Sequence, residues 1–319
     1  MRCFYTVVLL SILIWFGSCD NPDSNTVAIG VLQGPSAMSF IKMIDENPMI
    51  DGKKINLIIK DEPQQIQAMM MQNKLDFAVL PTIMAANLYN KGVKYQMVAC
   101  PVWGSLYIVS SDDVIKTIDD LNDKKIHIFG QGATVDILLQ REIELNHLKN
   151  IQLDYTYTTN PDLAAALQQN IIRTAVVSEP LVSVLIRKNS KIHIVSKLNC
   201  EEFLGNSDKD IFAQTAFLVR KSLTQSDAQL VDDINDLYIQ SCNYLSDEPA
   251  NAAGLLVKHG FFNDTVAATS AIKLSNIRYV SAFAIEQEVN RYLNIFYEFN
   301  PESIGGKLPE KDFFYCKDF

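Results

Sequence analysis

The sequence is poor in the residue patterns on which many enzymes and metal sites depend. It has four histidines, and they are scattered without the spacing of metal ligands. It contains no G-x-S-x-G, H-E-x-x-H or G-x-x-x-x-G-K-[ST] motif and no paired metal-binding cysteines. These absences exclude the commonest hydrolase, zinc-protease and P-loop signatures. We therefore predict that the protein is not an enzyme and has no catalytic residue, cofactor or metal site.

Positive charge is also scarce. The chain has 28 Lys and Arg residues against 37 Asp and Glu residues, which gives a formal net charge of −9. No basic stripe is available to displace counterions from phosphates, so a nucleic-acid partner is not expected. With 319 residues, 48% of them hydrophobic, the chain is long enough for one or two packed cores.

The N-terminus carries an export signal. An apolar run at residues 3–16 follows the positive charge of Met1 and Arg2. It is shorter than the ~20 residues of a membrane span and fits the h-region of a signal peptide. The run ends in FGSC, where two small residues precede Cys19, as in a bacterial lipobox, although Phe16 replaces the usual leucine.

We therefore predict a signal peptide at residues 1–19, a lipid anchor on Cys19 and a polar tether at residues 20–26. The protein would be exported, membrane-anchored and monomeric. An ordinary signal peptide that happens to contain Cys19 is the alternative. Four widely spaced cysteines follow, and their spacing indicates no pairing, so free, buried thiols are expected at Cys100, Cys200, Cys242 and Cys316.

Strand-like and helix-like segments alternate between residues 27 and 220, and the pattern is helical from residue 225 to about residue 299. One junction recurs four times, as VLQGPS, VLPT, FGQGAT and VVSEP. Each puts a turn with small residues or proline between the carboxyl end of a strand and the amino end of a helix. Ligands of open α/β sheets bind at that edge, where helix starts offer free backbone N–H groups.

The FGQGAT turn has three interpretations. It matches two glycines of the dinucleotide fingerprint, but Val135 stands where the third belongs, and Asp154 is misplaced for a ribose contact. It could also be a turn that needs glycine for backbone reasons only. The third interpretation, a small anionic or polar ligand on the N–H groups of Gly132, Ala133 and Thr134, is favoured.

Three longer segments resemble one family of exported receptors. They are NKLDFAVLPTIMAANLYNKG, IKTIDDLNDKKIHIFGQGATVDILLQREIELNHL and NPDLAAALQQNIIRTAVVSEPLVSVLI. This combination is similar to the substrate-binding proteins of ABC importers for nitrate, sulfonates, taurine and thiamine-pyrimidine precursors. The resemblance implies an α/β, two-lobe type II periplasmic-binding-protein fold, in which each lobe is a mostly parallel sheet flanked by helices. It also implies a small-molecule ligand between the lobes and an ABC permease as partner.

The family's organisation implies lobe 1 at residues 27–111 plus 211–319 and an inserted lobe 2 at residues 112–210, with chain crossings near residues 110 and 210 as a hinge. Carried over by position, the resemblance implies ligand contacts from the four turns and from the segment near residue 103. These residues are Gln33, Gly34, Ser36, Pro81, Thr82, Trp103, Gly104, Gln131, Gly132, Ala133, Thr134, Glu179 and Pro180.

Two of these residues have alternative roles. Trp103 could be a packed core aromatic, and Glu179 could cap a helix without meeting ligand. If Glu179 does face the cleft, it disfavours a bare anion such as nitrate and suits a ligand with a donor group, such as an amine or an aminopyrimidine. For the whole chain, a ligand sensor or structural lipoprotein on the same fold is the alternative to a solute receptor. An exported enzyme is less favoured.

Overall fold

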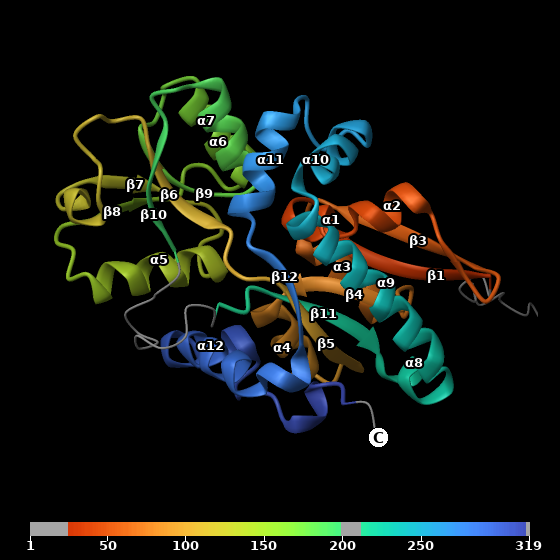
Figure 1. Cartoon of the computed structure of the whole chain (residues 1–319). Coiled ribbons are helices and arrows are strands. Elements are labelled where there is room, and N and C mark those ends of the chain that lie inside the picture. The colour runs from red at the N-terminus through yellow and green to blue at the C-terminus, as the bar shows by residue number, and fades with distance from the viewer. Residues whose placement is uncertain (1–24, 199–211, 317–319) are drawn as a thin grey trace, which may run out of the picture.

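The chain folds around two β-sheets, each flanked by helices, that lie side by side (Figure 1). The computed structural model describes residues 25–198 and 212–316. Cys19, Cys200, the signal peptide and most of the tether predicted from the sequence lie outside these residues. Within them, no helix is long and apolar enough to cross a membrane.

The larger sheet has seven strands in the order β12-β5-β11-β4-β1-β3-β2. Strand β1 runs parallel to β3 and to β4, whereas β11 is antiparallel to both β4 and β5. We refer to this sheet and its helices as lobe 1. Its strands are β1 (Thr26–Leu32), β2 (Met49–Ile50), β3 (Lys53–Lys60), β4 (Phe77–Pro81), β5 (Tyr95–Val102), β11 (Thr215–Arg220) and β12 (Ile277–Ser281).

The smaller sheet has five strands in the order β10-β6-β9-β7-β8 and forms lobe 2. Strand β7 runs parallel to β8 and β9, and β6 is antiparallel to β9 and β10. The strands are β6 (Leu106–Ser110), β7 (Lys125–His127), β8 (Gln152–Asp154), β9 (Thr174–Ser178) and β10 (His193–Lys197).

Helices follow most of the parallel strands and cover the sheets (Figure 1). In lobe 1 they are α1 (Pro35–Met38), α2 (Ile41–Glu46), α3 (Pro63–Met71), α4 (Thr82–Asn90), α8 (Lys221–Ser226), α9 (Ala228–Asp247), α10 (Pro249–Lys258), α11 (Thr265–Leu274) and α12 (Glu286–Phe299). In lobe 2 they are α5 (Thr134–Leu145), α6 (Asn160–Gln168) and α7 (Leu181–Lys188). Short 3₁₀ turns are η1 (Ile118–Leu121), η3 (Ala282–Ile285), η4 (Pro301–Ile304) and η5 (Lys311–Phe313).

The α/β alternation predicted from the sequence is confirmed. The sheets are mixed and not mostly parallel, because β2, β5, β11 and β12 in lobe 1 and β6 and β10 in lobe 2 pair antiparallel. Strand β12 interrupts the region that was expected to be helical, because the segment between α11 and η3 pairs with β5 at the sheet edge. The predicted lobe division placed residues 106–110 in lobe 1. Strand β6 nevertheless pairs with β9 and β10, so the change from one sheet to the other falls at residues 103–105.

Helix α11 of lobe 1 packs against α7 of lobe 2 and so connects the lobes on one side of the molecule (Figure 1). The Tyr107 hydroxyl on β6 donates to the Leu274 carbonyl at the end of α11 over 2.6 Å. The Arg187 and Asp264 side chains form an ion pair of 3.6 Å between the same two regions. Lobe 1 therefore holds lobe 2 through its C-terminal helices as well as through the chain crossings.

The largest buried side chains lie in lobe 1. The Phe40 and Tyr238 rings stack at 4.1 Å between centroids, and Phe217 contacts both. The thiols of Cys100 and Cys242 are free and buried, as expected, and burial raises the pKa of each. Cys316 is exposed, so its expected burial was wrong: the residue lies in the C-terminal tail beyond the last core aromatics.

Candidate functional site

A cavity of about 570 Å³ lies between the two lobes, and we call it the interlobe cleft. Its walls come from turns at the carboxyl ends of parallel strands in both sheets. Lobe 1 supplies the turns after β1, β3 and β4, and lobe 2 supplies the turns after β7, β8 and β9. Because the carboxyl ends of parallel strands share an edge, the two sheets direct six helix starts at one space.

Eight of the residues predicted from the sequence line this cleft. Lobe 1 contributes Gln33, Gly34, Ser36 and Pro81, and lobe 2 contributes Ala133, Thr134, Glu179 and Pro180. The first and fourth turns face each other across it: a Cβ atom built on Gly34 would lie 3.5 Å from the Glu179 carbonyl oxygen. That distance is an ordinary van der Waals contact, but Gly34 has a φ of 106°, a backbone conformation that residues with a Cβ atom rarely adopt, so the turn favours glycine.

Three predicted residues lie in the structural framework around the cleft and are not among those that line it. Thr82 is fully buried, and its hydroxyl donates to the Ala213 carbonyl. Trp103 is 2% exposed, and its indole N–H donates to the Arg278 carbonyl over 2.8 Å. Trp103 is therefore a packed core aromatic, which was the alternative role considered for it. Gly104 has a φ of 89° at the crossing between the sheets.

The Gly-x-Gly turn is filled by the protein's own carboxylate. Asp136, which is 2% exposed in the first turn of α5, accepts the Gly132 N–H over 2.7 Å. It also accepts hydrogen bonds from the Gln140 amide at 2.9 Å and the Tyr155 hydroxyl at 2.7 Å. The Ala133 N–H bonds to the Gly130 carbonyl. Two of the three donors expected to hold a ligand anion are thus already engaged.

Gln131 and Gly132 themselves are exposed and are not among the lining residues. Glycine is nevertheless required at position 132 for a backbone reason, since its φ is 73°. The structure therefore fits the interpretation of a turn that needs glycine better than the interpretation of an anion cradle.

Glu179 is the most unusual ionisable group of the cleft. Its side chain is 1% exposed, and its only described partner is Ser183, whose hydroxyl donates to Oε1 over 2.9 Å. The N–H of Ser183 lies 3.5 Å from Oε2, so Glu179 caps the first turn of α7 while lining the cleft. Burial without a counter-charge raises the pKa of Glu179 to about 8, although the bonds from Ser183 oppose that rise.

The sequence analysis missed a second source of carboxylates. Asp61 and Glu62 follow β3 and precede Pro63 at the start of α3, and both line the cleft. Thr159 and Asn160 do the same after β8. Both junctions carry a signal of the kind used for the other four, since a strand end is followed by a turn and a proline in the first turn of a helix. Phe261, from the loop between α10 and α11, has no such signal.

The described lining of the cleft is mostly apolar, and its charged side chains are all acidic. It includes the carboxylates of Asp61, Glu62 and Glu179, but no lysine, arginine or histidine. Hydroxyl and amide groups make up much of the remaining polar lining, as in Ser105 and Gln214. Among residues 25–198 and 212–316, no three His, Cys, Asp or Glu side chains are grouped to hold a metal ion.

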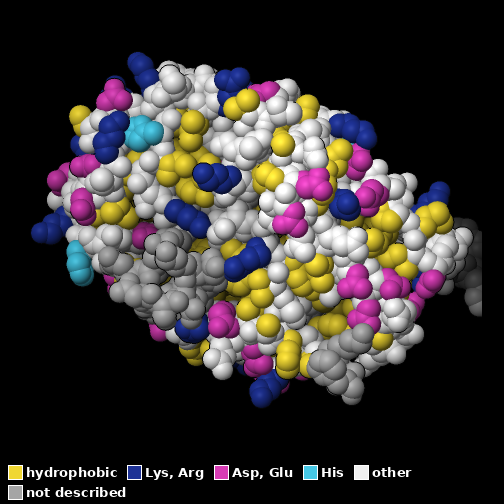
Figure 2. Space-filling model, in the orientation of Figure 1, with side chains coloured by type: hydrophobic (Ala, Val, Ile, Leu, Met, Phe, Trp, Pro, Cys, Tyr) yellow, Lys and Arg dark blue, Asp and Glu magenta, His cyan; other side chains and the backbone are white. Residues whose placement is uncertain are grey.

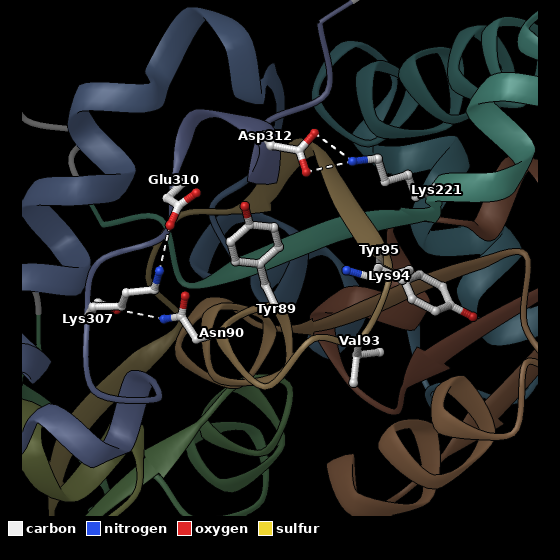
Figure 3. Close-up of a pocket in the computed structure, with 9 residues that line it drawn as sticks. All are labelled: Tyr89, Asn90, Val93, Lys94, Tyr95, Lys221, Lys307, Glu310 and Asp312. Carbon is white, nitrogen blue, oxygen red and sulfur yellow. Dashed lines mark hydrogen bonds and ion pairs between the residues drawn. The ribbon is translucent and has the colours of Figure 1, made fainter.

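A smaller surface pocket of about 160 Å³ lies at the C-terminal tail and contains three lysines (Figure 3). Lys221 pairs with Asp312 at 2.7 Å, and Lys307 pairs with Glu310 at 2.5 Å. The first pair attaches the tail to α8, whereas the second lies within the tail, which Asn90 of α4 holds by donating to the Lys307 carbonyl. The charges of these pairs therefore serve mainly to fix the chain. Elsewhere, acidic and basic side chains are interspersed over the face shown in Figure 2.

Comparison with known proteins identifies the architecture. No family model matches the sequence, and no curated protein matches it significantly. Among solved structures, an ABC transporter protein from Parabacteroides distasonis is 29% identical and has a TM-score of 0.80, with 92% of this chain and 100% of that chain covered. The chain has the type II periplasmic-binding-protein fold.

Two further structures share this fold at lower identity. The periplasmic aliphatic sulphonate binding protein SsuA of Escherichia coli is 17% identical, with a TM-score of 0.68 and 93% and 96% of the two chains covered. The periplasmic nitrate-binding protein NrtA of Synechocystis PCC 6803 is 12% identical, with a TM-score of 0.65 and 88% and 82% covered. The resemblance to ABC-importer binding proteins predicted from the sequence is confirmed by these neighbours.

The carboxylate at the start of α5 gives a first prediction. Replacing Asp136 by alanine leaves the Gly132 N–H and the Tyr155 hydroxyl without their acceptor, so the free energy of unfolding should fall by about 2–4 kcal/mol. Asp162 occupies the matching position of α6 but is exposed. Asp162→Ala should cost about 1 kcal/mol or less. Urea unfolding measures both, and equal losses would contradict the role of Asp136.

The buried carboxyl of Glu179 gives a second prediction. Because its pKa is higher in the folded chain than in the unfolded chain, the native state holds the proton more tightly. Stability should therefore fall as pH rises from about 5 to about 8, by up to about 1.4 kcal/mol per unit, and be unaffected by this group above pH 8. Denaturant unfolding at each pH, compared with Glu179→Gln, isolates the effect. Parallel curves for the two proteins would refute it.

Proposed function

We propose that this chain is an extracytoplasmic solute-binding lipoprotein, which captures a small polar molecule between its lobes and delivers it to an ABC importer. The interlobe cleft is the single observation that supports this most strongly. Its two walls belong to different sheets, so a solute can contact both lobes at once. Closure would then be a population shift driven by contacts that exist only when both lobes engage the solute.

The structural neighbours support the same function. SsuA and NrtA are named as periplasmic binding proteins for aliphatic sulphonates and nitrate, respectively. The fold and the position of the cleft agree with such a role. The chemistry of the lining differs from what a bare anion requires.

The alternative is a sensor or structural lipoprotein that keeps the fold without carrying a solute. A cleft filled by apolar side chains would favour it. The cleft instead keeps a volume of about 570 Å³ and exposes hydroxyl and amide groups such as those of Ser178 and Asn160. An open cavity that keeps polar groups in a mostly apolar wall favours the receptor. Among the described lining residues, no paired nucleophile and base supports catalysis.

The receptor function gives a third prediction. A solute at ~100 times its dissociation constant should stabilise the protein lacking residues 1–19 by about 2.7 kcal/mol in a thermal-shift assay. Defined amines, anions and a small-molecule extract of a bacterial culture provide the panel. Ala133→Trp, which places a large ring in the cleft wall, should abolish the shift. Ala250→Trp, at an exposed helix start outside the cleft, should preserve it.

Each outcome of that screen is informative. A shift that survives Ala133→Trp would place the binding site elsewhere. A protein stabilised neither by the defined compounds nor by the extract would contradict the receptor function and favour the structural lipoprotein.

The lipid anchor gives a fourth prediction. We propose that the thiol of Cys19 carries the lipid, on the basis of the small residues that precede it. Full-length protein expressed in a bacterium should partition with membranes, and Cys19→Ser should release it or stop its processing. Cys3→Ser, inside the apolar run, is the matched control and should leave partitioning unchanged. Fractionation followed by mass spectrometry of the N-terminal peptide distinguishes lipidation from ordinary signal cleavage.

A further inference from the structure

We propose that the interlobe cleft selects a small organic cation, one that carries a protonated amine or an amidinium-like group, and rejects nitrate and sulfonates. This inference rests on the proposed receptor function and specifies its ligand class. It departs from the ligands in the names of SsuA and NrtA, because it follows the side chains of this cleft.

Carboxylates approach the cleft from both lobes. Asp61 and Glu62 extend from lobe 1, are exposed, and have no ion pair with any residue that the structure describes. Glu179 lines the opposite wall in lobe 2 and meets a hydroxyl and an N–H from Ser183 but no cation. A positively charged group placed between these walls would face carboxylates on two sides and would favour the closed arrangement of the lobes.

An anion would find little compensation in the same place. The described lining contains no lysine, arginine or histidine. At the start of α5, the helix dipole and the Gly132 N–H already interact with the buried carboxylate of Asp136. A nitrate or sulfonate near this turn would therefore meet an existing negative charge, and it would lose hydration without gaining a counter-charge.

The remaining lining suits the organic body of such a cation. Phe129 from lobe 2 and Phe261 from lobe 1 contribute aromatic rings, and Leu181 and Val184 add apolar surface beside Glu179. Aromatic faces attract ammonium and guanidinium groups as well as apolar carbon. In addition, Thr215 lines the cleft with a buried hydroxyl oxygen that has no hydrogen-bond partner among the described residues.

Binding of a cation beside Glu179 should release a proton. The groups that face this carboxyl are Ser183 on α7 and Tyr107 on β6, whose hydroxyl is held by the Leu274 carbonyl. Neither neutralises it, and the raised pKa leaves Glu179 largely protonated at neutral pH. A nearby cation favours the ionised form, so affinity should increase with pH up to about 8, by up to about tenfold per unit, and then level off.

The test uses two pools of defined probes on the protein lacking residues 1–19. Benzylamine, putrescine, agmatine and benzamidine form the cationic pool; nitrate, methanesulfonate, benzenesulfonate and benzoate form the anionic pool. The culture extract is also divided by ion exchange into cationic and anionic fractions. We expect thermal stabilisation by the cationic pool or fraction only, with affinity measured by calorimetry from pH 6 to pH 9.

Variants connect the effect to the named carboxylates. Glu179→Gln, which retains an acceptor for Ser183, should weaken binding of the stabilising amine about tenfold or more at pH 8 and abolish the pH dependence. Asp61→Asn with Glu62→Gln should weaken it several-fold without changing that dependence. Asp113→Asn removes a carboxylate whose side chain is 84% exposed outside the cleft, and it should change neither.

The outcomes separate this inference from the function beneath it. Stabilisation by the anionic pool or fraction would overturn the cationic class while leaving the receptor function intact. An unchanged amine affinity in Glu179→Gln would overturn the role of the cleft carboxylates. Absence of any stabilisation, including by the undivided extract, would overturn the receptor function itself.

Discussion

The arrangement of the whole molecule depends on the hydrogen-bonded crossing between its two sheets. Ser105 is the central residue: its N–H donates to the Gln214 side chain over 2.7 Å, and its carbonyl accepts the Glu179 N–H over 2.9 Å. Beside it, Trp103 and Asn276 exchange hydrogen bonds of 3.0 and 2.6 Å. The segment between the sheets is therefore hydrogen-bonded to Glu179 in lobe 2, to Gln214 just before β11 and to Asn276 just before β12. These hydrogen bonds therefore restrict relative movement of the lobes at this crossing.

Features with local signals could be predicted from the sequence, whereas features that depend on pairing with a distant strand could not. The strand–turn–helix junctions were recognisable because their signals are local: an apolar strand, then a small residue or proline, then a helical face. The role of β12 was not, because Ile277–Ser281 becomes a strand only by pairing with β5 at the sheet edge. The assignment of Leu106–Ser110 to the second sheet likewise depends on pairing with β9, a partner far away in the sequence.

The candidate site shows the same limit at the level of side chains. The family resemblance, carried over by position in the turns, implied that Gly34 and Glu179 would border one cavity, and both line it. The same reasoning could not separate Ala133, which lines the cavity, from Gly132, one residue earlier, which does not. Nor could it show that Asp136 turns back to accept the Gly132 N–H. Spacing identifies a helix start with free donors, but only the packed structure shows whether an internal acceptor has taken them.

Proteins with the same fold can therefore have ligand clefts of different charge. A helix start that points at a cleft attracts negative charge, and at α5 the side chain of Asp136 provides it. Once the dipole and a donor are satisfied internally, the ionisable groups that remain in the described lining are the carboxylates of Asp61 and Glu62 and the carboxyl group of Glu179, which a nearby cation would ionise. A sulphonate-binding and a nitrate-binding protein share the fold of this chain. The sign of the charge that the ligand carries depends on the side chains of the cleft, and the cationic class proposed above follows from them.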